Sequence, residues 1–264
     1  MACENLFAAA HACFRECDPE RKVAAVKGLY ARWRQGRVHL GKPESDPGRV
    51  PGRPERPQLV PPEAVRFRSV ATPEGRAALL HALAHIEFNA IHLALDAILR
   101  FPDLPEAFHV GWLKVAAEEA EHFELICAHM YASCACRYGD LPAHDGLWEM
   151  AVRTAHDPLV RMALVPRLFE ARGLDATPAI LRKFQGIGDR RAVEILERIL
   201  AEEIGHVALG DTWFRQLCAA RGLEPEATFQ ALLQEYDAPR PRRPFNEAAR
   251  RAAGFSAAEL ARFV

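Results

Sequence analysis

The segments AEEAEHFELI (residues 117–126) and AEEIGHVALG (residues 201–210) repeat one pattern within a chain of 264 residues. Each has a Glu-Glu pair and then a His three residues after the second Glu. Positions i and i+3 share one face of a helix, so the second Glu and the His of each segment point the same way. The flanking residues are mostly apolar, which predicts that both pairs lie on helices facing a protein interior.

A second level of repetition links these pairs to two further carboxylates. Glu87 lies 32 residues before Glu119, and Glu170 lies 33 residues before Glu203. Chance placement of the Glu and His residues of this chain gives about one Glu-x-x-His pair, so a single pair is weak evidence. The further Glu at a nearly constant distance before each of the two pairs carries more weight. A third pair begins at Glu106, lacks such a setting, and is interpreted as chance.

Each of the two early Glu residues and each Glu-x-x-His pair falls in the middle of a separate predicted long helix. Several carboxylates buried without partners would cost more free energy than an ordinary domain has to spare. Two divalent cations would resolve this cost. The sequence therefore predicts a metal site with six ligands: Glu87, Glu119, His122, Glu170, Glu203 and His206.

This ligand set resembles that of the ferritin-like di-metal carboxylate proteins. The resemblance implies two iron ions as cofactors, and manganese suits the same oxygen and imidazole ligands. The segments PGRPERPQLVPP and HALAHIEFNAIHLALDA also resemble an uncharacterised bacterial ferritin-like family, a domain of unknown function. The overall layout is similar, more distantly, to the tRNA hydroxylase of the same superfamily.

The residue before each ligand Glu has two interpretations. The resemblance implies that Glu118 and Glu202 hold ligand histidines through hydrogen bonds from outside the ligand set. Alternatively, both are solvated or paired with a basic side chain. His81, His85 and His92 lie away from the Glu87 face of their helix, so we expect them to pack or form hydrogen bonds rather than bind metal.

The predicted fold class is all-α, a ferritin-like four-helix bundle with additional N- and C-terminal helices. The long bundle helices are expected over residues 72–99, 103–131, 157–172 and 189–220, with shorter helices over 147–154, 177–185 and 225–236. Three regions follow: a helical region with a Pro-rich segment (residues 1–71), the bundle (72–220) and a helical extension (221–264). The Pro-rich part is either a free linker or a fixed strap. Pro166 is expected to bend or bulge the third bundle helix near Glu170.

Composition narrows the function classes. The formal net charge of −1 gives no general electrostatic basis for binding nucleic acid or an acidic membrane. Histidines and Glu87 interrupt the most apolar stretch, so no membrane span is expected. Seven cysteines without paired Cys-x-x-Cys motifs, and an early Glu4 in place of a basic leader, favour a cytoplasmic protein.

These observations favour a non-haem di-iron or di-manganese oxidoreductase, O2-dependent, acting on an unidentified small-molecule or nucleotide substrate with an electron donor. The alternatives are a ferroxidase-type, iron-binding or iron-sensing protein, a tRNA-modifying hydroxylase, and an interaction module whose metal site is purely structural. A phosphate backbone could contact the basic run Arg240, Arg242, Arg243, Arg250 and Arg251. The favoured interpretation is a solvated basic tail, partly offset by Glu247. A homodimer is compatible with this interpretation.

Overall fold

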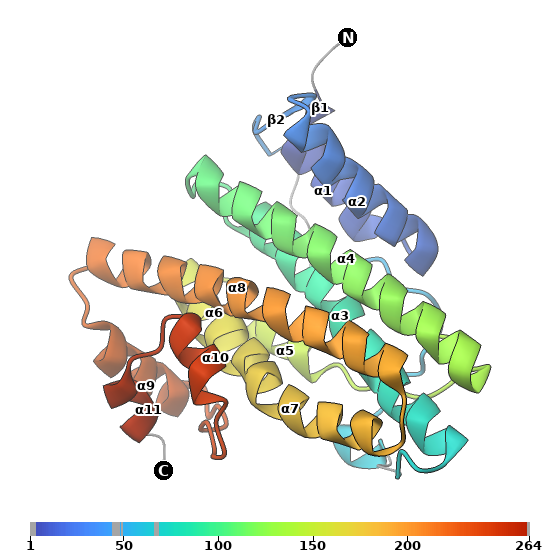
Figure 1. Cartoon of the computed structure of the whole chain (residues 1–264). Helices are drawn as coiled ribbons and strands as arrows, with labels where there is room; N and C mark the ends of the chain where they lie inside the picture. The colour runs from blue at the N-terminus through green and yellow to red at the C-terminus, as the bar shows by residue number, and fades with distance from the viewer. Residues whose placement is uncertain (1–3, 44–47, 49, 66–68, 263–264) are drawn as a thin grey trace. The chain divides into compact units, whose positions relative to one another are not determined.

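The computed structural model describes residues 4–43, 48, 50–65 and 69–262. The chain divides into two compact units, Met1–Trp148 and Glu149–Val264. Both units are built from helices, so the predicted all-α class is confirmed (Figure 1). The division at Trp148 falls inside the predicted bundle of residues 72–220, and the predicted region boundaries remain a prediction.

The first unit contains four main helices. They are α1 (Leu6–Arg15), α2 (Pro19–Arg34), α3 (Pro73–Arg100) and α4 (Glu106–Cys134). Helix α3 packs along α4, while α1 packs on α3 and α2 packs on α4. A short parallel pairing joins β1 (Glu4–Asn5) to β2 (Val38–His39).

Polar side chains define where these helices begin and end. Asp18 caps α2 by accepting a hydrogen bond from the N–H of Arg21, and Thr72 caps α3 in the same way through Gly75. Lys22 is fully buried, and its Nζ donates to the carbonyl oxygens of residues 13 and 14 in the last turn of α1, at 3.0 and 2.9 Å. The buried lysine side chain thus satisfies carbonyls that the end of a helix leaves without partners.

The Pro-rich segment is a fixed strap rather than a free linker in its described part. The N–H of Gly52 donates to the carbonyl oxygen of Phe14 at 2.8 Å. Arg53 Nη1 donates to Asp145 Oδ2 at 2.7 Å, and the N–H of Val60 donates to a carbonyl of the same loop, that of Ala143. The strap also includes a 3₁₀ turn, η1 (Pro62–Ala64). These bonds tie the strap to α1 and to the loop after α4.

Helix α3 corrects the expectation that its histidines and Glu87 interrupt the apolar stretch too much for a membrane span. It is the one described helix that is long and apolar enough to cross a membrane by length and composition, so the interrupting histidines do not exclude a span on those grounds. However, 83% of the relevant window is buried within the fold, as in the core helix of a globular unit. His81 and His85 are buried and form hydrogen bonds, as expected: His81 Nε2 accepts from the N–H of Gly139 at 2.9 Å, and His85 Nδ1 lies 2.8 Å from Tyr138 Oη.

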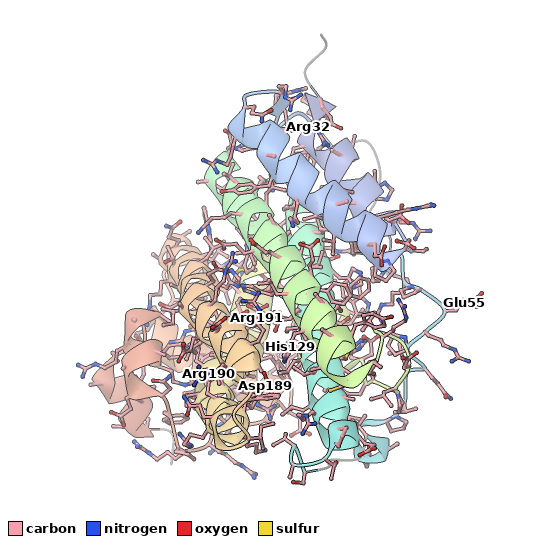
Figure 2. The ribbon with its side chains drawn as sticks, turned by 45° about the vertical axis from the view of Figure 1, so that its right-hand side comes forward. Arg32, Glu55, His129, Asp189, Arg190 and Arg191 are labelled. Carbon is pink, nitrogen blue, oxygen red and sulfur yellow. The ribbon has the colours of Figure 1, made fainter. Side chains whose placement is uncertain are left out.

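The second unit is organised around its longest helix, α8 (Arg190–Ala220). Asp189, labelled in Figure 2, caps α8 by accepting from the N–H of Ala192 at 3.0 Å. Helix α8 packs on α6 (Pro158–Leu164), on the π-helical turn η2 (Val165–Glu170) and on α7 (Ala171–Gly186). The remaining helices are α9 (Pro225–Glu235), α10 (Glu247–Ala252) and α11 (Ala257–Arg262), while α5 (Gly146–Arg153) spans the division between the units.

The expected break between residues 172 and 177 is wrong, because α7 continues through Pro178 to Gly186. A proline lacks the N–H that would bond to the carbonyl four residues earlier, here that of Leu174. Asn246 Nδ2 donates to that carbonyl at 3.3 Å instead. The helix therefore tolerates the proline because a distant side chain replaces the missing donor.

Arg250, part of the basic C-terminal run, serves the interior of the second unit. It is 1% exposed, and its guanidinium donates to both carboxylate oxygens of Asp175, the shortest bond being 2.7 Å. Arg243 pairs with Glu247 at 3.3 Å. Arg250 thus contributes to folding rather than to an exposed basic surface.

Candidate metal centre

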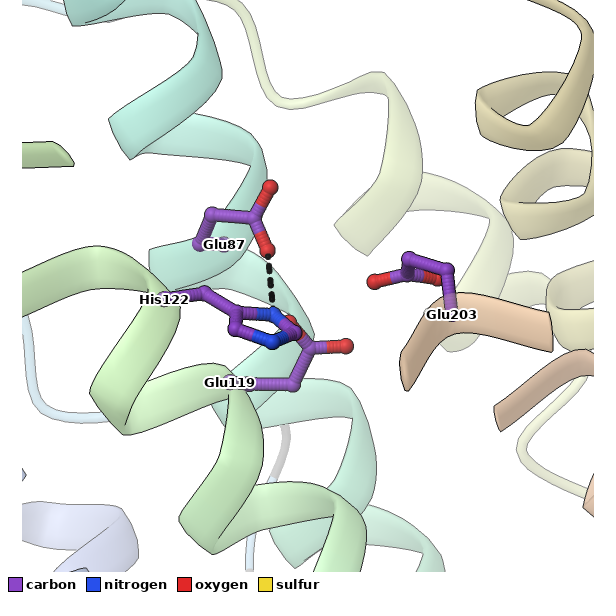
Figure 3. Close-up of side chains that lie close together, drawn as sticks. All are labelled: Glu87, Glu119, His122 and Glu203. Atoms are coloured by element: carbon purple, nitrogen blue, oxygen red, sulfur yellow. Dashed lines mark hydrogen bonds and ion pairs between the residues drawn. The ribbon is translucent and has the colours of Figure 1, made fainter. Parts of the chain in front are cut away.

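Three of the predicted ligands gather inside the first unit. Glu87 comes from the middle of α3, and Glu119 and His122 come from one face of α4 (Figure 3). His122 Nδ1 lies 3.2 Å from Glu119 Oε2 and 3.3 Å from Glu87 Oε2. All three side chains are at least 93% buried, and each offers a ligand atom within 4.8 Å of the others.

The charge balance of this triad is unfavourable without a cation. Two buried carboxyl groups face one imidazole, and each places its Oε2 within 3.3 Å of the same nitrogen, Nδ1 of His122. Burial, followed by the charge of Glu119, raises the pKa of Glu87 to about 8. A divalent cation would replace the missing positive charge, so the triad could hold a metal ion.

The second unit contains the other repeat. On α8, His206 Nδ1 lies 3.4 Å from Glu203 Oε1, and the imidazole is buried while Glu203 is 15% exposed. Glu203 is drawn in Figure 3 on its own helix. Glu170, which is half-buried, is the last residue of the π-helical turn that packs on α8. The predicted assignment of these three residues as ligands is not tested by these contacts and remains a prediction.

The π-helical turn agrees with the distortion expected from Pro166. Pro166 cannot donate a backbone hydrogen bond, and the helix widens from Val165 to Glu170 before α7 resumes. Single π turns inside α-helices frequently occur at functional sites. On α8, Gly210 makes room for this turn: a Cβ placed there would lie 2.4 Å from Cβ of Pro166.

The residues that precede the ligand glutamates both form ion pairs on their own helices. Glu118 Oε1 lies 3.2 Å from Nζ of Lys114, and Glu202 Oε1 lies 3.2 Å from Nε of Arg198. These pairs match the salt-bridged alternative. The predicted hydrogen bonds from these carboxylates to the ligand histidines remain a prediction.

In the third Glu-x-x-His pair, the histidine has a structural role. His109 is fully buried, its Nε2 lies 3.0 Å from the carbonyl oxygen of Leu104, and its ring contacts Phe7 edge-on at 5.1 Å. His109 therefore completes the turn before α4, consistent with interpreting this pair as chance.

Sequence reasoning missed an aromatic cluster beside the triad. Phe88 and Phe123 directly follow Glu87 and His122 in the chain, and their ring centroids lie 5.1 Å apart. Tyr138 packs on both rings, at 5.3 and 5.0 Å. The two phenylalanines were predictable from their places beside the ligands. Tyr138 lies in a loop, where no periodic pattern marks it.

Comparison with known proteins gives a family but no activity. The family model described as "Protein of unknown function (DUF455)" matches residues 15–261. An uncharacterized protein of Haemophilus influenzae is 46% identical over 258 residues, which cover 93% of this chain and 89% of the relative. No solved structure matches. The function must therefore be argued from the side chains.

Proposed function

Because the chain belongs to the DUF455 family, whose description names no activity, we propose its function from the repeated Glu-x-x-His segments. The proposal is a cytoplasmic, ferritin-like, non-haem di-iron oxidoreductase that uses O2, with manganese as the alternative metal. Its substrate would be a small molecule or a nucleotide, and an electron donor would restore the reduced metals.

The observation that carries the proposal is the buried triad of the first unit. Removing two carboxyl groups from water against a single imidazole is costly unless a cation joins them. Carboxylate oxygens and an imidazole nitrogen are suitable ligands for iron and manganese. We assign Glu87, Glu119 and His122 to one ion.

The second ion is assigned by the internal repeat. Glu170, Glu203 and His206 stand at nearly the same spacing as the first triad, and the π-helical turn ends at Glu170. When bound, the two ions would supply O2 binding and electron transfer. The role of the chain is to hold the ions, and the buried rings of Phe88 and Phe123 add apolar surface next to Glu87 and His122 along the chain.

The proposal is tested first by elemental analysis of the protein purified from cells supplied with iron and manganese. We expect about two transition-metal ions per chain in the wild type. His122→Ala and His206→Ala should each lose one or both ions. His109→Gln is the matched control, because it removes a histidine of the same motif that serves the fold, and it should keep both ions.

Bound metal would distinguish the proposed enzyme from a helical protein without a metal site. O2 uptake would distinguish it from a protein whose metal site serves storage, sensing or structure. Substrate-independent O2 uptake with added Fe(II) would favour a ferroxidase. Uptake that requires an unmodified tRNA would favour the hydroxylase alternative. Absence of metal after anaerobic loading with Fe(II) and with Mn(II) would refute the metal centre.

A further inference from the structure

A pair of cysteines at the end of α4 is not used by the proposed metal chemistry. Helix α4 ends at Cys134, and Ala135 then adopts the left-handed conformation with φ 52° and ψ 25°. Its N–H donates to the carbonyl oxygen of Tyr131 at 2.9 Å, which fixes the turn. Cys134 and Cys136 both line one cavity of about 470 Å³, beside Leu141.

The turn brings the two cysteines within the range of a disulfide. A residue with left-handed helical angles curves the chain as tightly as a right-handed helix does, and helix geometry then separates the Cα atoms of residues i and i+2 by about 5.4 Å. Disulfides usually need a Cα–Cα separation of about 4.4–6.8 Å. Both residues also line the same cavity, so the two side chains share an open space in which to approach each other.

The two thiols differ in their access to solvent. Cys134 is partly exposed and its Sγ lies 3.4 Å from Oγ of Ser133. Cys136 is buried, and burial raises the pKa of its thiol. A small oxidant would therefore reach Cys134 first, and the nearby thiol of Cys136 would react second.

We infer that Cys134 and Cys136 form a redox-active dithiol whose oxidant is a peroxide, with hydrogen peroxide as the simplest case. The thiolate of Cys134 attacks one peroxide oxygen and forms a sulfenic acid, releasing hydroxide that is protonated to water. The Cys136 sulfur then attacks the Cys134 sulfur, the S–S bond forms, and a second water leaves. Two thiols lose two electrons and two protons, and one peroxide becomes two waters.

Cys127 is the other cysteine of α4 that could compete for a disulfide, and it lies seven residues before Cys134. It lines a different cavity, the one between α2 and α4 that also contains Lys27 and Phe123. Along a helix, seven residues separate the Cα atoms of Cys127 and Cys134 by about 10.5 Å, which is farther than a disulfide spans. Cys127 therefore serves as an internal reference for the experiment.

Trypsin places all three thiols in one peptide, because residues 115–137 contain no Lys or Arg before Arg137. The full-length protein is reduced, freed of reductant, treated with hydrogen peroxide at low excess and alkylated under denaturing conditions. We expect this peptide to lose two of its three alkyl labels and to keep the label on Cys127. Treatment with a dithiol reductant after the peroxide should restore all three labels.

Three labels after peroxide treatment, or a disulfide that includes Cys127, would overturn the inference. Cys136→Ser should abolish the disulfide and leave a sulfenic acid on Cys134 that dimedone labels, whereas Cys127→Ser should form the disulfide as the wild type does. Circular dichroism checks that both variants fold. The same result is expected in EDTA, because the dithiol does not rest on the metal centre.

Discussion

His122 Nδ1 lies 3.3 Å from Oε2 of Glu87, yet the two residues come from different helices. The contact therefore depends on the packing of α3 against α4. Glu119 Oε2 lies 3.2 Å from the same nitrogen, so two buried carboxyl groups surround one ring. Metal binding and protonation of Glu87 become alternative ways to stabilise the same arrangement.

This competition predicts how the metal-free protein responds to pH. The pKa of Glu87 is raised from 4.5 to about 8, so the folded state holds the proton more tightly than the unfolded state. The stabilising effect of that proton is complete below pH 4.5 and is lost as the pH rises through about 8. We expect the melting temperature of the EDTA-treated wild type to fall across this range relative to that of Glu87→Gln.

Glu87 should give metal affinity a pH dependence opposite to that of the stability of the metal-free protein. A metal ion must displace the proton, so the affinity for Mn(II), measured by calorimetry, should rise with pH up to about 8. Glu87→Gln should weaken binding at least tenfold. Glu194→Gln, an exposed carboxylate paired with Arg191 on α8, is the control and should bind as the wild type does. Equal affinity in both variants would remove Glu87 from the ligand set.

A further prediction concerns Gly210, which packs against the π-helical turn. In Gly210→Ala the new Cβ would lie 2.4 Å from Cβ of Pro166, and the turn that ends at Glu170 would have to move. We expect a loss of about 1–3 kcal/mol in the free energy of unfolding, measured by urea denaturation, together with weaker metal binding.

Gly205→Ala is the matched control for that experiment, because it lies on the same helix and its Cβ would meet nothing within 4 Å. It should stabilise the protein by roughly 0.5–1 kcal/mol, the usual gain when alanine replaces glycine inside a helix. If both variants behaved alike, close packing at Gly210 would not matter.

The helices were largely predictable because their start signals are local. Thr72, Asp157 and Asp189 stand first in three of the predicted ranges and cap the observed helices, as Asp18 caps α2, because a short polar side chain binds the N–H groups of the first turn. The π distortion at Pro166 was also local. Each of these features depends on residues within a few positions of one another.

The failures involve partners far away in the sequence. A separate helix was predicted over residues 177–185, but Pro178 lies inside α7. Asn246 supplies the hydrogen bond that Pro178 cannot donate, and no local pattern indicates that distant partner. The choice between linker and strap likewise depended on Gly52 meeting Phe14. For the metal centre, the repeat identified the residues of the triad, whereas the burial of Glu87 and its distance from His122 required the structure.

The strap supplies a further prediction, since Gly52 touches the backbone at the end of α1. A Cβ on Gly52 would lie 2.1 Å from the carbonyl oxygen of Arg15, and a backbone oxygen cannot move aside as a side chain can. Gly52→Ala should break the hydrogen bond to Phe14 and speed hydrogen exchange across residues 50–60, measured by mass spectrometry. Gly28→Ala, which meets only the flexible end of Arg32, should leave that exchange unchanged.

Lys22 supplies the last prediction, with a pH dependence opposite to that of Glu87. Burial lowers the pKa of Lys22 from 10.5 to about 7, so the unfolded state binds this proton more tightly than the folded state. The contribution of Lys22 to stability is therefore complete above pH 10.5 and is lost as the pH falls through about 7. Lys22→Met removes the titrating group, although it also leaves two carbonyl oxygens of α1 without their donor. The variant should be less stable overall, and the difference between it and the wild type should widen between pH 7 and pH 9 in urea denaturation. A constant difference across that range would mean that Lys22 stays charged inside the fold, held by the carbonyls that it caps.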